Sequence, residues 1–241
     1  MRIAVVRNDD TDGVIAHSDQ PSPERYGRRT VRAVVEALRA GRHFVAEIEG
    51  DVTMFAALQD FLADSDPIHG DVLVLNMAYG VQGEARYTHV PAMLELAGVP
   101  YTGAGPLGHS ICLDKVVAKV LMVDAGIPTP AYTVMSAPGS ELGALRFPLI
   151  VKPRRESTSN GLALVDDCGG LDDAVASIVV TYRQDALVEE YVYGREVCVG
   201  LLGNYPPLPT RGATRAGTGR NRPGLAPSGV QPSNRTVRFL T

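Results

Sequence analysis

The sequence predicts an α/β protein in which an N-terminal, doubly wound parallel sheet is followed by a second, mixed α+β unit. Strand-like and helix-like segments alternate regularly between residues 2 and 103. The alternation breaks at the glycine- and proline-containing segment 103–106, and several strand candidates then surround one helix. Regular alternation is typical of βαβ units with parallel strands, whereas clustered strands favour an antiparallel or mixed sheet.

The first part supplies four strand candidates and three helices. The first helix candidate has Val31, Val34, Val35 and Leu38 at helical spacing and a stop signal at Gly41. No G-x-G-x-x-G motif follows the first strand, which disfavours a dinucleotide site there. The expected strands are RIAVVRN (2–8), FVAEIEG (44–50), DVLVLNM (71–77) and VPYTG (99–103), and the expected helices are 26–43, 53–66 and 89–98.

The second part begins with a helix expected over residues 110–126, in which Lys115 and Lys119 are four residues apart and share a face. For Lys119 we expect a solvated position. The expected strands are YTVM (132–135), FPLIVKP (147–153), GLALV (161–165) and further strands within 186–204, around a helix at 171–184.

The segment VKPRRESTSNG, residues 151–161, forms the loop of a hairpin running from Leu149 to Val165 and is too long for a two-residue turn. Its hydroxyl groups, small side chains and accessible backbone N–H groups are the parts of an anion-binding nest. An ordinary polar surface loop is the alternative that the residues alone leave open.

Charge is distributed unevenly along the chain. The last segment, from Arg211 onward, contains six arginines and no Lys, Asp or Glu, which leaves the first 210 residues with 27 acidic residues and a net charge of −10. This tail is rich in Gly, Pro, Ser and Thr and is expected to be disordered. An arginine-rich arm for nucleic acid or membrane is one interpretation. A sequence unrelated to the fold is the interpretation we favour, so we expect no nucleic-acid or membrane partner.

Composition also bears on compartment. The three cysteines (Cys112, Cys168 and Cys198) are far apart and odd in number, and the histidines lack ligand spacing. No signal peptide and no run of about 20 apolar residues is present. We therefore expect a cytoplasmic protein without a structural metal. Of the 23 basic residues only Lys115, Lys119 and Lys152 are lysine, a compact point charge suited to a phosphate oxygen.

The ordered motifs LDKVVAK, GIPTP, FPLIVKPRRESTSNGLALV and ALVEEYVYGRE resemble those of the ATP-grasp ligases, most closely D-alanine–D-alanine ligases. The resemblance covers residues 1–209 and is strongest from 90 to 204. It implies a pre-ATP-grasp domain at 1–104, an ATP-grasp N-terminal subdomain at 105–186 and the start of its C-terminal subdomain at 187–210. The tail then occupies 211–241.

The resemblance also implies site residues. Lys115 and Lys152 match lysines that contact ATP phosphates. Two residues match catalytic positions on the substrate side: Glu24 matches a glutamate near the amino group of the first substrate, and Thr158 matches a serine that helps to position the substrate. Tyr79 stands where the family often has histidine, which bears on substrate choice. The remaining residues match ATP-binding positions. Those of the phosphate-covering loop are Glu156, Ser157, Ser159, Asn160 and Gly161. Those of the adenine hinge are Glu189, Glu190, Tyr191 and Val192, and the ribose contact is Glu196.

The family uses ATP and Mg²⁺, and its magnesium-binding carboxylates follow the segment matched by Glu196. No Asp or Glu follows Glu196 here, so no metal ligand can be assigned and the ATP-grasp domain is expected to be incomplete. The implied activity is ligation of amino-acid substrates through an acyl phosphate, with ADP and phosphate released, and we expect this truncated form to be inactive. The alternative is a non-catalytic ATP-binding or interaction protein with a basic nucleic-acid-binding arm. A homodimer is left open.

Overall fold

The structure is a computed structural model and describes residues 1–9, 14, 22, 24–63, 65, 70–197 and 199–200. The chain divides into two compact units, Met1–Val192 and Tyr193–Thr241. The predicted tail, with its arginines, lies outside the described residues, and the expected domain boundaries stay predictions. None of the helices formed by the described residues is long and apolar enough to cross a membrane.

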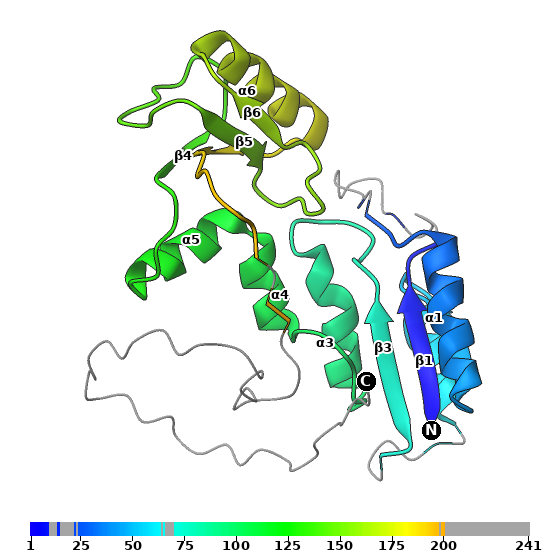
Figure 1. Ribbon diagram of the computed structural model, residues 1–241. Helices are drawn as coiled ribbons and strands as arrows, with labels where there is room; N and C mark the ends of the chain where they lie inside the picture. The colour runs from blue at the N-terminus through cyan, green and yellow to red at the C-terminus, as the bar shows by residue number, and fades with distance from the viewer. Residues whose placement is uncertain are drawn as a thin grey trace. The chain divides into compact units, whose positions relative to one another are not determined.

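The first sheet is parallel, as the alternation of strands and helices predicts. Its strands are β1 (Arg2–Arg7), β2 (Phe44–Glu49) and β3 (Val72–Met77), in the order β2-β1-β3. Figure 1 shows β1 and β3 running side by side with α1 (Arg28–Ala40) packed along the sheet. The short strand expected at 99–103 is reduced to a parallel bridge between Tyr101 and Val74.

Helices cover both faces of this sheet, which explains its continuous apolar strands. Ala4 and Val6 pack with α2 (Met54–Leu62) and α3 (His89–Leu96), whereas Val5, which points to the other face, packs with α1. Because successive side chains of a strand alternate between faces, a strand buried on both sides must be apolar at every position. The doubly wound arrangement follows from this pattern.

The second sheet is antiparallel and has the order β4-β7-β5-β6. Its strands are β4 (Tyr132–Met135), β5 (Leu149–Pro153), β6 (Ala163–Val165) and β7 (Ala186–Glu190), and α6 (Cys168–Tyr182) packs on one face. Leu149 and Val151 point toward α6, so Lys152 points to the opposite face. On that face Glu189 of the neighbouring strand β7 can reach it. The expected hairpin over 149–165 is confirmed.

Two short helices replace the single helix expected over 110–126. They are α4 (Pro106–Leu113) and α5 (Lys115–Asp124), and Asp114 between them has an extended backbone with φ −82° and ψ 97°. The Asp114 carboxylate accepts hydrogen bonds from the N–H groups of Val116 and Val117, so it caps α5. The periodic pattern concealed this break because apolar residues continue through it.

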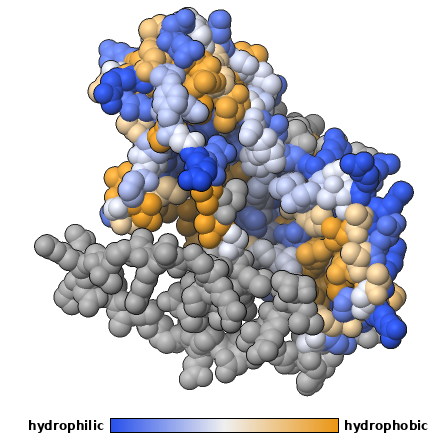
Figure 2. Space-filling model, in the orientation of Figure 1, coloured by the Kyte–Doolittle hydropathy of each residue, from blue (hydrophilic) through white to orange (hydrophobic). Residues whose placement is uncertain are grey.

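The solvent-facing side of α5 is apolar. Val120 and Val123 are exposed at 54% and 61%, and Ile127, which follows the helix, is exposed at 53%. Figure 2 shows apolar side chains at the surface over this helix. The aliphatic residues on α5 therefore do not all serve the described core, and the helical period alone does not explain them.

The core beneath α6 provides a test of the second sheet. Leu149 is fully buried, whereas Leu164, on the paired strand of the same hairpin, is 53% exposed. We expect Leu149→Ala to lower the free energy of unfolding by about 3 kcal/mol, because it removes buried methyl groups and leaves a cavity. Leu164→Ala should cost less than about 1 kcal/mol. Urea denaturation of both variants measures the difference, and equal losses would contradict this packing.

Candidate functional site

One cavity of about 360 Å³ is lined by both predicted phosphate lysines and by all the site residues predicted in the loop except Gly161. Lys115 comes from the first turn of α5, and Lys152 comes from β5. The β5–β6 loop, residues 154–162, supplies most of the remaining wall. The lining includes Glu156, Ser157, Thr158, Ser159 and Asn160 from the predicted set, together with Tyr87, His109 and Cys112.

Lys115 is held at the base of the β5–β6 loop. Its Nζ donates to the carbonyl oxygens of Pro153 at 3.1 Å and Arg154 at 3.4 Å, and also to that of Glu156. Burial, followed by the charge of nearby Lys152, lowers the pKa of Lys115 to about 8. A half-buried cation that donates only to neutral carbonyls and lies near a second cation is suited to receive an anion.

Lys152 belongs to a second buried charge group. Its Nζ donates to Glu189 on β7, and Lys119 Nζ lies 2.9 Å from the other oxygen of the same carboxylate. Burial alone would raise the pKa of Glu189, but the hydrogen bonds and charges of Lys152 and Lys119 together hold it below its usual value. Glu189 therefore shares its charge between two lysines from different elements.

The expectation that Lys119 is solvated is wrong. Lys119 is 6% exposed, and its ammonium also donates to the Thr129 hydroxyl at 2.7 Å and the Pro130 carbonyl at 3.1 Å. Its Nζ lies 4.8 Å from the centre of the Tyr132 ring. The partner carboxylate is 70 positions away in the sequence, so spacing within one helix could not reveal it.

The tip of the β5–β6 loop has an unusual backbone. Thr158 and Ser159 have φ values of 54° and 62°, in the left-handed region that side-chain-bearing residues rarely adopt. Two such residues in succession, one of them β-branched, indicate that the surrounding contacts impose the loop conformation. Gly161, also at positive φ, approaches Pro153 and Tyr182 so closely that a Cβ would lie 2.7 Å from each. Close packing against Pro153 and Tyr182 therefore explains why residue 161 is a glycine.

Asp114 fixes the start of the same loop. Besides capping α5, its carboxylate receives Arg154 Nε at 2.8 and 2.9 Å and Arg155 Nε at 3.3 Å. Burial would raise the pKa of Asp114, but Arg154 and the other donors lower it. One carboxylate thus joins the beginning of α5, where Lys115 lies, to the first two residues of the loop.

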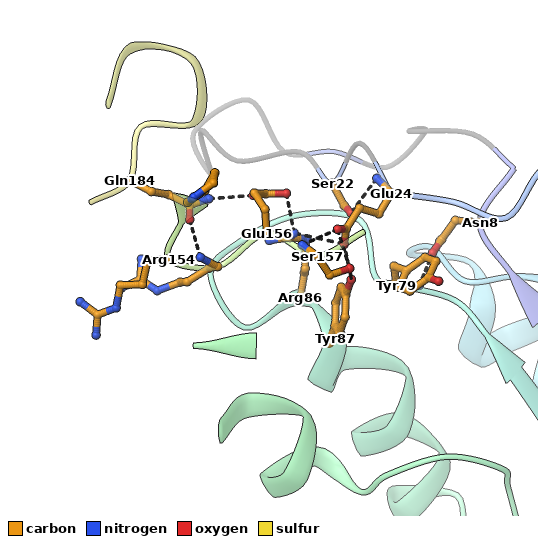
Figure 3. A network of polar contacts seen from close by, with 12 residues as sticks. Asn8, Ser22, Glu24, Tyr79, Arg86, Tyr87, Arg154, Glu156, Ser157 and Gln184 are labelled. Atoms are coloured by element: carbon orange, nitrogen blue, oxygen red, sulfur yellow. Dashed lines mark hydrogen bonds and ion pairs between the residues drawn. The ribbon is translucent and has the colours of Figure 1, made fainter. Parts of the chain in front are cut away.

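A larger buried group holds the next part of the loop. Arg86 lies in η2 (Arg86–Thr88) and is 1% exposed; its Nη2 contacts Glu24 at 3.4 Å and Glu156 at 3.0 Å. Gln184 donates to Glu156 at 2.7 Å and accepts from the Arg155 N–H at 2.8 Å. Figure 3 shows these side chains converging from separate parts of the chain. We call Glu24, Arg86, Tyr87, Glu156, Ser157 and Gln184 the Arg86 cluster.

Glu24 is the most fully bonded member of this cluster. Its Oε1 accepts from the N–H and the hydroxyl of Ser157, both at 2.7 Å, and its Oε2 accepts from Tyr87 and Arg86. Burial would raise the pKa of Glu24, but these hydrogen bonds and the charge of Arg86 lower it. The carboxylate is ionised and already holds four donors, and Ser157 makes its contact to the loop.

Aromatic rings lie beside Glu24. Tyr79 stacks between Tyr26 and Tyr87, with centroids 5.1 and 5.2 Å away, and its N–H donates to Asn8 at 2.9 Å. Tyr87 also meets His109 edge-on at 6.0 Å. Burial lowers the pKa of His109, so its imidazole is neutral near pH 7. Its buried Nε2 has no hydrogen-bond partner among the described residues, although its ring lines the cavity.

Two backbone N–H groups of the predicted adenine hinge are already used in hydrogen bonds to neighbouring segments of the chain. The N–H groups of Glu190 and Tyr191 donate to the carbonyls of Ala131 and Pro148, both at 3.0 Å. Val192 is 67% exposed, and Glu196 is exposed in the second unit. The hinge and ribose roles stay predictions. A backbone-bound adenine would use groups beyond these two N–H groups.

The residues present were also tested against a metal ion. Within the described part of the chain, no group of three or more His, Cys, Asp or Glu side chains is arranged to hold one. The carboxylates near the cavity are engaged by Arg86, Gln184 and Ser157, so they do not fit a magnesium site. ATP fits better, because two lysines and a hydroxyl-rich loop face a cavity of about 360 Å³.

Several site residues had no sequence prediction. Arg86 and Tyr87 read as ordinary loop residues, since their partners are more than 60 positions away. His109 gave no signal either. Asp114 could have been found, because an Asp directly before a helical pattern is an N-cap signal.

Comparison with known proteins shows which proteins this chain is similar to. Residues 121–213 match the family model described as the D-Ala–D-Ala ligase C-terminus. The D-alanine–D-alanine ligase of Alcanivorax borkumensis is 36% identical over 179 residues, which is 74% of this chain and 55% of that protein. The chain is a homologue of the ATP-grasp ligases and is most like D-alanine–D-alanine ligase.

Further relatives agree with this assignment. An uncharacterized protein of Sinorhizobium fredii, y4sG, is 48% identical over 208 residues, covering 85% of this chain and 62% of its own length. The D-alanine–D-alanine ligase of Bacillus anthracis in complex with ATP shares the fold, with a TM-score of 0.57, 23% identity, and coverage of 80% of this chain and 57% of that one. The D-alanine–D-alanine ligase of Coxiella burnetii has a TM-score of 0.59 and 21% identity, with coverage of 86% of this chain and 68% of that one. The chain spans roughly 55–62% of the length of such curated relatives.

The buried pair of Lys119 and Glu189 gives a prediction for this ATP-grasp sheet. Replacing Lys119 by Met should lower the free energy of unfolding by about 2 kcal/mol, less than the full cost of breaking a buried pair because Lys152 still serves Glu189. Val120→Ala, at an exposed position on the same helix, is the matched control. Chemical denaturation measures both variants, and an unchanged midpoint for Lys119→Met would show that the pair contributes nothing.

Proposed function

We propose that this chain binds ATP at the cavity beneath the β5–β6 loop, as the nucleotide-binding part of an ATP-dependent carboxylate–amine ligase. The observation that carries the proposal is the convergence of Lys115 and Lys152 on one cavity wall formed by Ser157, Thr158 and Ser159. Phosphate groups require positive charge and hydrogen-bond donors together, and this wall offers both. The relatives named as D-alanine–D-alanine ligases support amino acids as the substrate class.

The two lysines have different parts in this proposal. Lys152 is oriented by Glu189, so its ammonium is held in place at the end of β5. Lys115 is bonded to three carbonyls and has no carboxylate partner of its own in those contacts. A phosphate oxygen would therefore gain most from Lys115, whose charge is least compensated, and would take its geometry from Lys152.

The loop contributes hydroxyl and N–H donors. Thr158 and Ser159 hold left-handed backbones, and successive backbone N–H groups in such conformations form concave anion sites. Bound ATP would supply the phosphoryl group for activation of a substrate carboxylate. The residues of this chain would bind the phosphates, hold them in place and exclude water.

We expect ATP binding without turnover. Residues 197–241 contain no Asp or Glu, and the described carboxylates near the cavity do not fit magnesium. The carboxylate pair that magnesium needs is therefore supplied neither by the described residues nor by residues 197–241.

Titration calorimetry with ATP tests the binding. Lys152→Ala should raise the Kd at least about tenfold, since it removes a charge-assisted contact. Arg29→Ala, an exposed charge on α1, should leave the Kd unchanged. Absence of binding to the wild-type protein would overturn the proposal. Phosphate release with ATP, Mg²⁺ and D-alanine should not exceed that of Lys152→Ala, and release above that control would show that the chain turns over ATP.

The lowered pKa of Lys115 gives ATP binding a pH dependence. Lys115 is charged below about pH 8 and loses its proton as the pH rises through that value. ATP affinity should therefore fall between pH 7.5 and 9.5, above the range in which a terminal phosphate titrates. Lys115→Arg keeps its charge over this range, so its Kd should stay flat. A wild-type Kd that is equally flat would exclude Lys115 from the phosphate site.

A further inference from the structure

The phosphate loop is connected to residues far outside it, and one side chain makes the central connection. Glu24 belongs to the segment before α1, Arg86 to η2, and Glu156 to the β5–β6 loop. The Arg86 guanidinium lies between the two carboxylates, and one of its nitrogens, Nη2, donates to both of them. Figure 3 shows this bridge at the centre of the network.

Burial makes the bridge energetically decisive. Arg86 and the Glu24 side chain are each 1% exposed, and the Glu156 side chain is 6% exposed. Two carboxylates removed from water beside the same loop repel each other unless a cation separates them. Arg86 contacts both carboxylates. Lys115, the other cation near Glu156, bonds to the backbone carbonyl of Glu156 and not to its carboxylate.

The backbone around Arg86 is fitted to this position. Gly80 has a φ of +77°, and a Cβ there would lie 2.0 Å from the Arg86 carbonyl oxygen. The residue that follows, Tyr87, donates to Glu24 and lies 2.6 Å from the Ser157 hydroxyl. η2 therefore presents two consecutive side chains to the loop, one charged and one phenolic.

We propose that Arg86 is a positioning residue for the phosphate loop, holding Glu156 and Ser157 over the cavity before a nucleotide binds. It acts through its bridge between Glu24 and Glu156 and does not itself line the cavity. Ser157 uses both of its donors on Glu24, so loop placement determines where the donors of Thr158 and Ser159 lie. The effect of this placement on ATP binding rests on the proposed function, whereas the positioning of the loop by Arg86 does not.

Trypsin offers a direct measure of loop opening, because the Arg155–Glu156 bond lies in the loop beside the cluster. Cleavage after Arg146, whose side chain is 84% exposed, serves as an internal reference. Without nucleotide, Arg86→Met should raise initial cleavage after Arg155 at least about tenfold relative to cleavage after Arg146. Arg29→Met, an exposed arginine on α1, is the matched control and should leave the ratio unchanged.

A double-mutant cycle separates positioning from general support of the fold. If Arg86 holds the loop through Glu156, then Arg86→Met combined with Glu156→Gln should open the loop no further than Arg86→Met alone. Additive effects, or an unchanged cleavage ratio in Arg86→Met, would overturn the proposal. If Arg86→Met does not unfold cooperatively, Arg86→Lys replaces it. The lysine ammonium keeps the charge but ends short of the position of Arg86 Nη2, so a smaller rise is expected, and no rise would be the contrary result.

ATP titration of the same variants tests the link to function separately. If the wild-type protein binds ATP, Arg86→Met should weaken binding by about tenfold while Arg29→Met does not. An opened loop with unchanged ATP affinity would refute the positioning role for the nucleotide. If Arg86→Met opens the loop but the wild-type protein does not bind ATP, the proposed function is refuted and the positioning of the loop by Arg86 still stands.

Discussion

A buried carboxylate must find cationic or hydrogen-bonding partners, and three carboxylates impose this requirement on the structure around the cavity. Asp114 holds the start of the β5–β6 loop through two arginines, and Glu24 holds its middle through Ser157. Glu189 orients Lys152 at the end of β5. In each, burial acts to raise the pKa and the partners reverse it. The loop is therefore positioned mainly by ionised groups attached to other elements.

Lys115 behaves in the opposite way, and the contrast indicates function. The three carboxylates have lowered pKa values, so their ionised forms are favoured by folding. The pKa of Lys115 is also lowered, to about 8, which means that folding disfavours its charged form. These carboxylates are compensated by their partners, whereas the half-buried Lys115 is less well compensated, so an external anion at Lys115 would complete the charge balance.

Much of the fold could be predicted from the sequence because the signals for it were local, whereas the break at Asp114 between α4 and α5 was missed. Periodicity located β1, α1 and the β5–β6 hairpin, and the continuous apolar strands indicated a sheet covered on both faces. The ordered motifs also singled out Lys115 and Lys152, which line one cavity, although their phosphate role stays a prediction. Arg86 could not be predicted, because a lone arginine in a polar segment looks the same whether it is solvated or buried between Glu24 and Glu156. Lys119 was misread for the same reason, since its carboxylate lies on a distant strand.

The contacts of Glu24 change what the family resemblance implies. Its alignment suggested a carboxylate near a substrate amino group, yet both of its oxygens are engaged by Ser157, Tyr87 and Arg86. A carboxylate with four donors has little capacity left for an ammonium group unless a donor leaves. Of these donors only Ser157 belongs to the β5–β6 loop, so a movement of the loop would release it. Amine binding at Glu24 and closure of the loop over phosphate would then compete for the same oxygen, and Arg86 on the other oxygen would stay in place through both states.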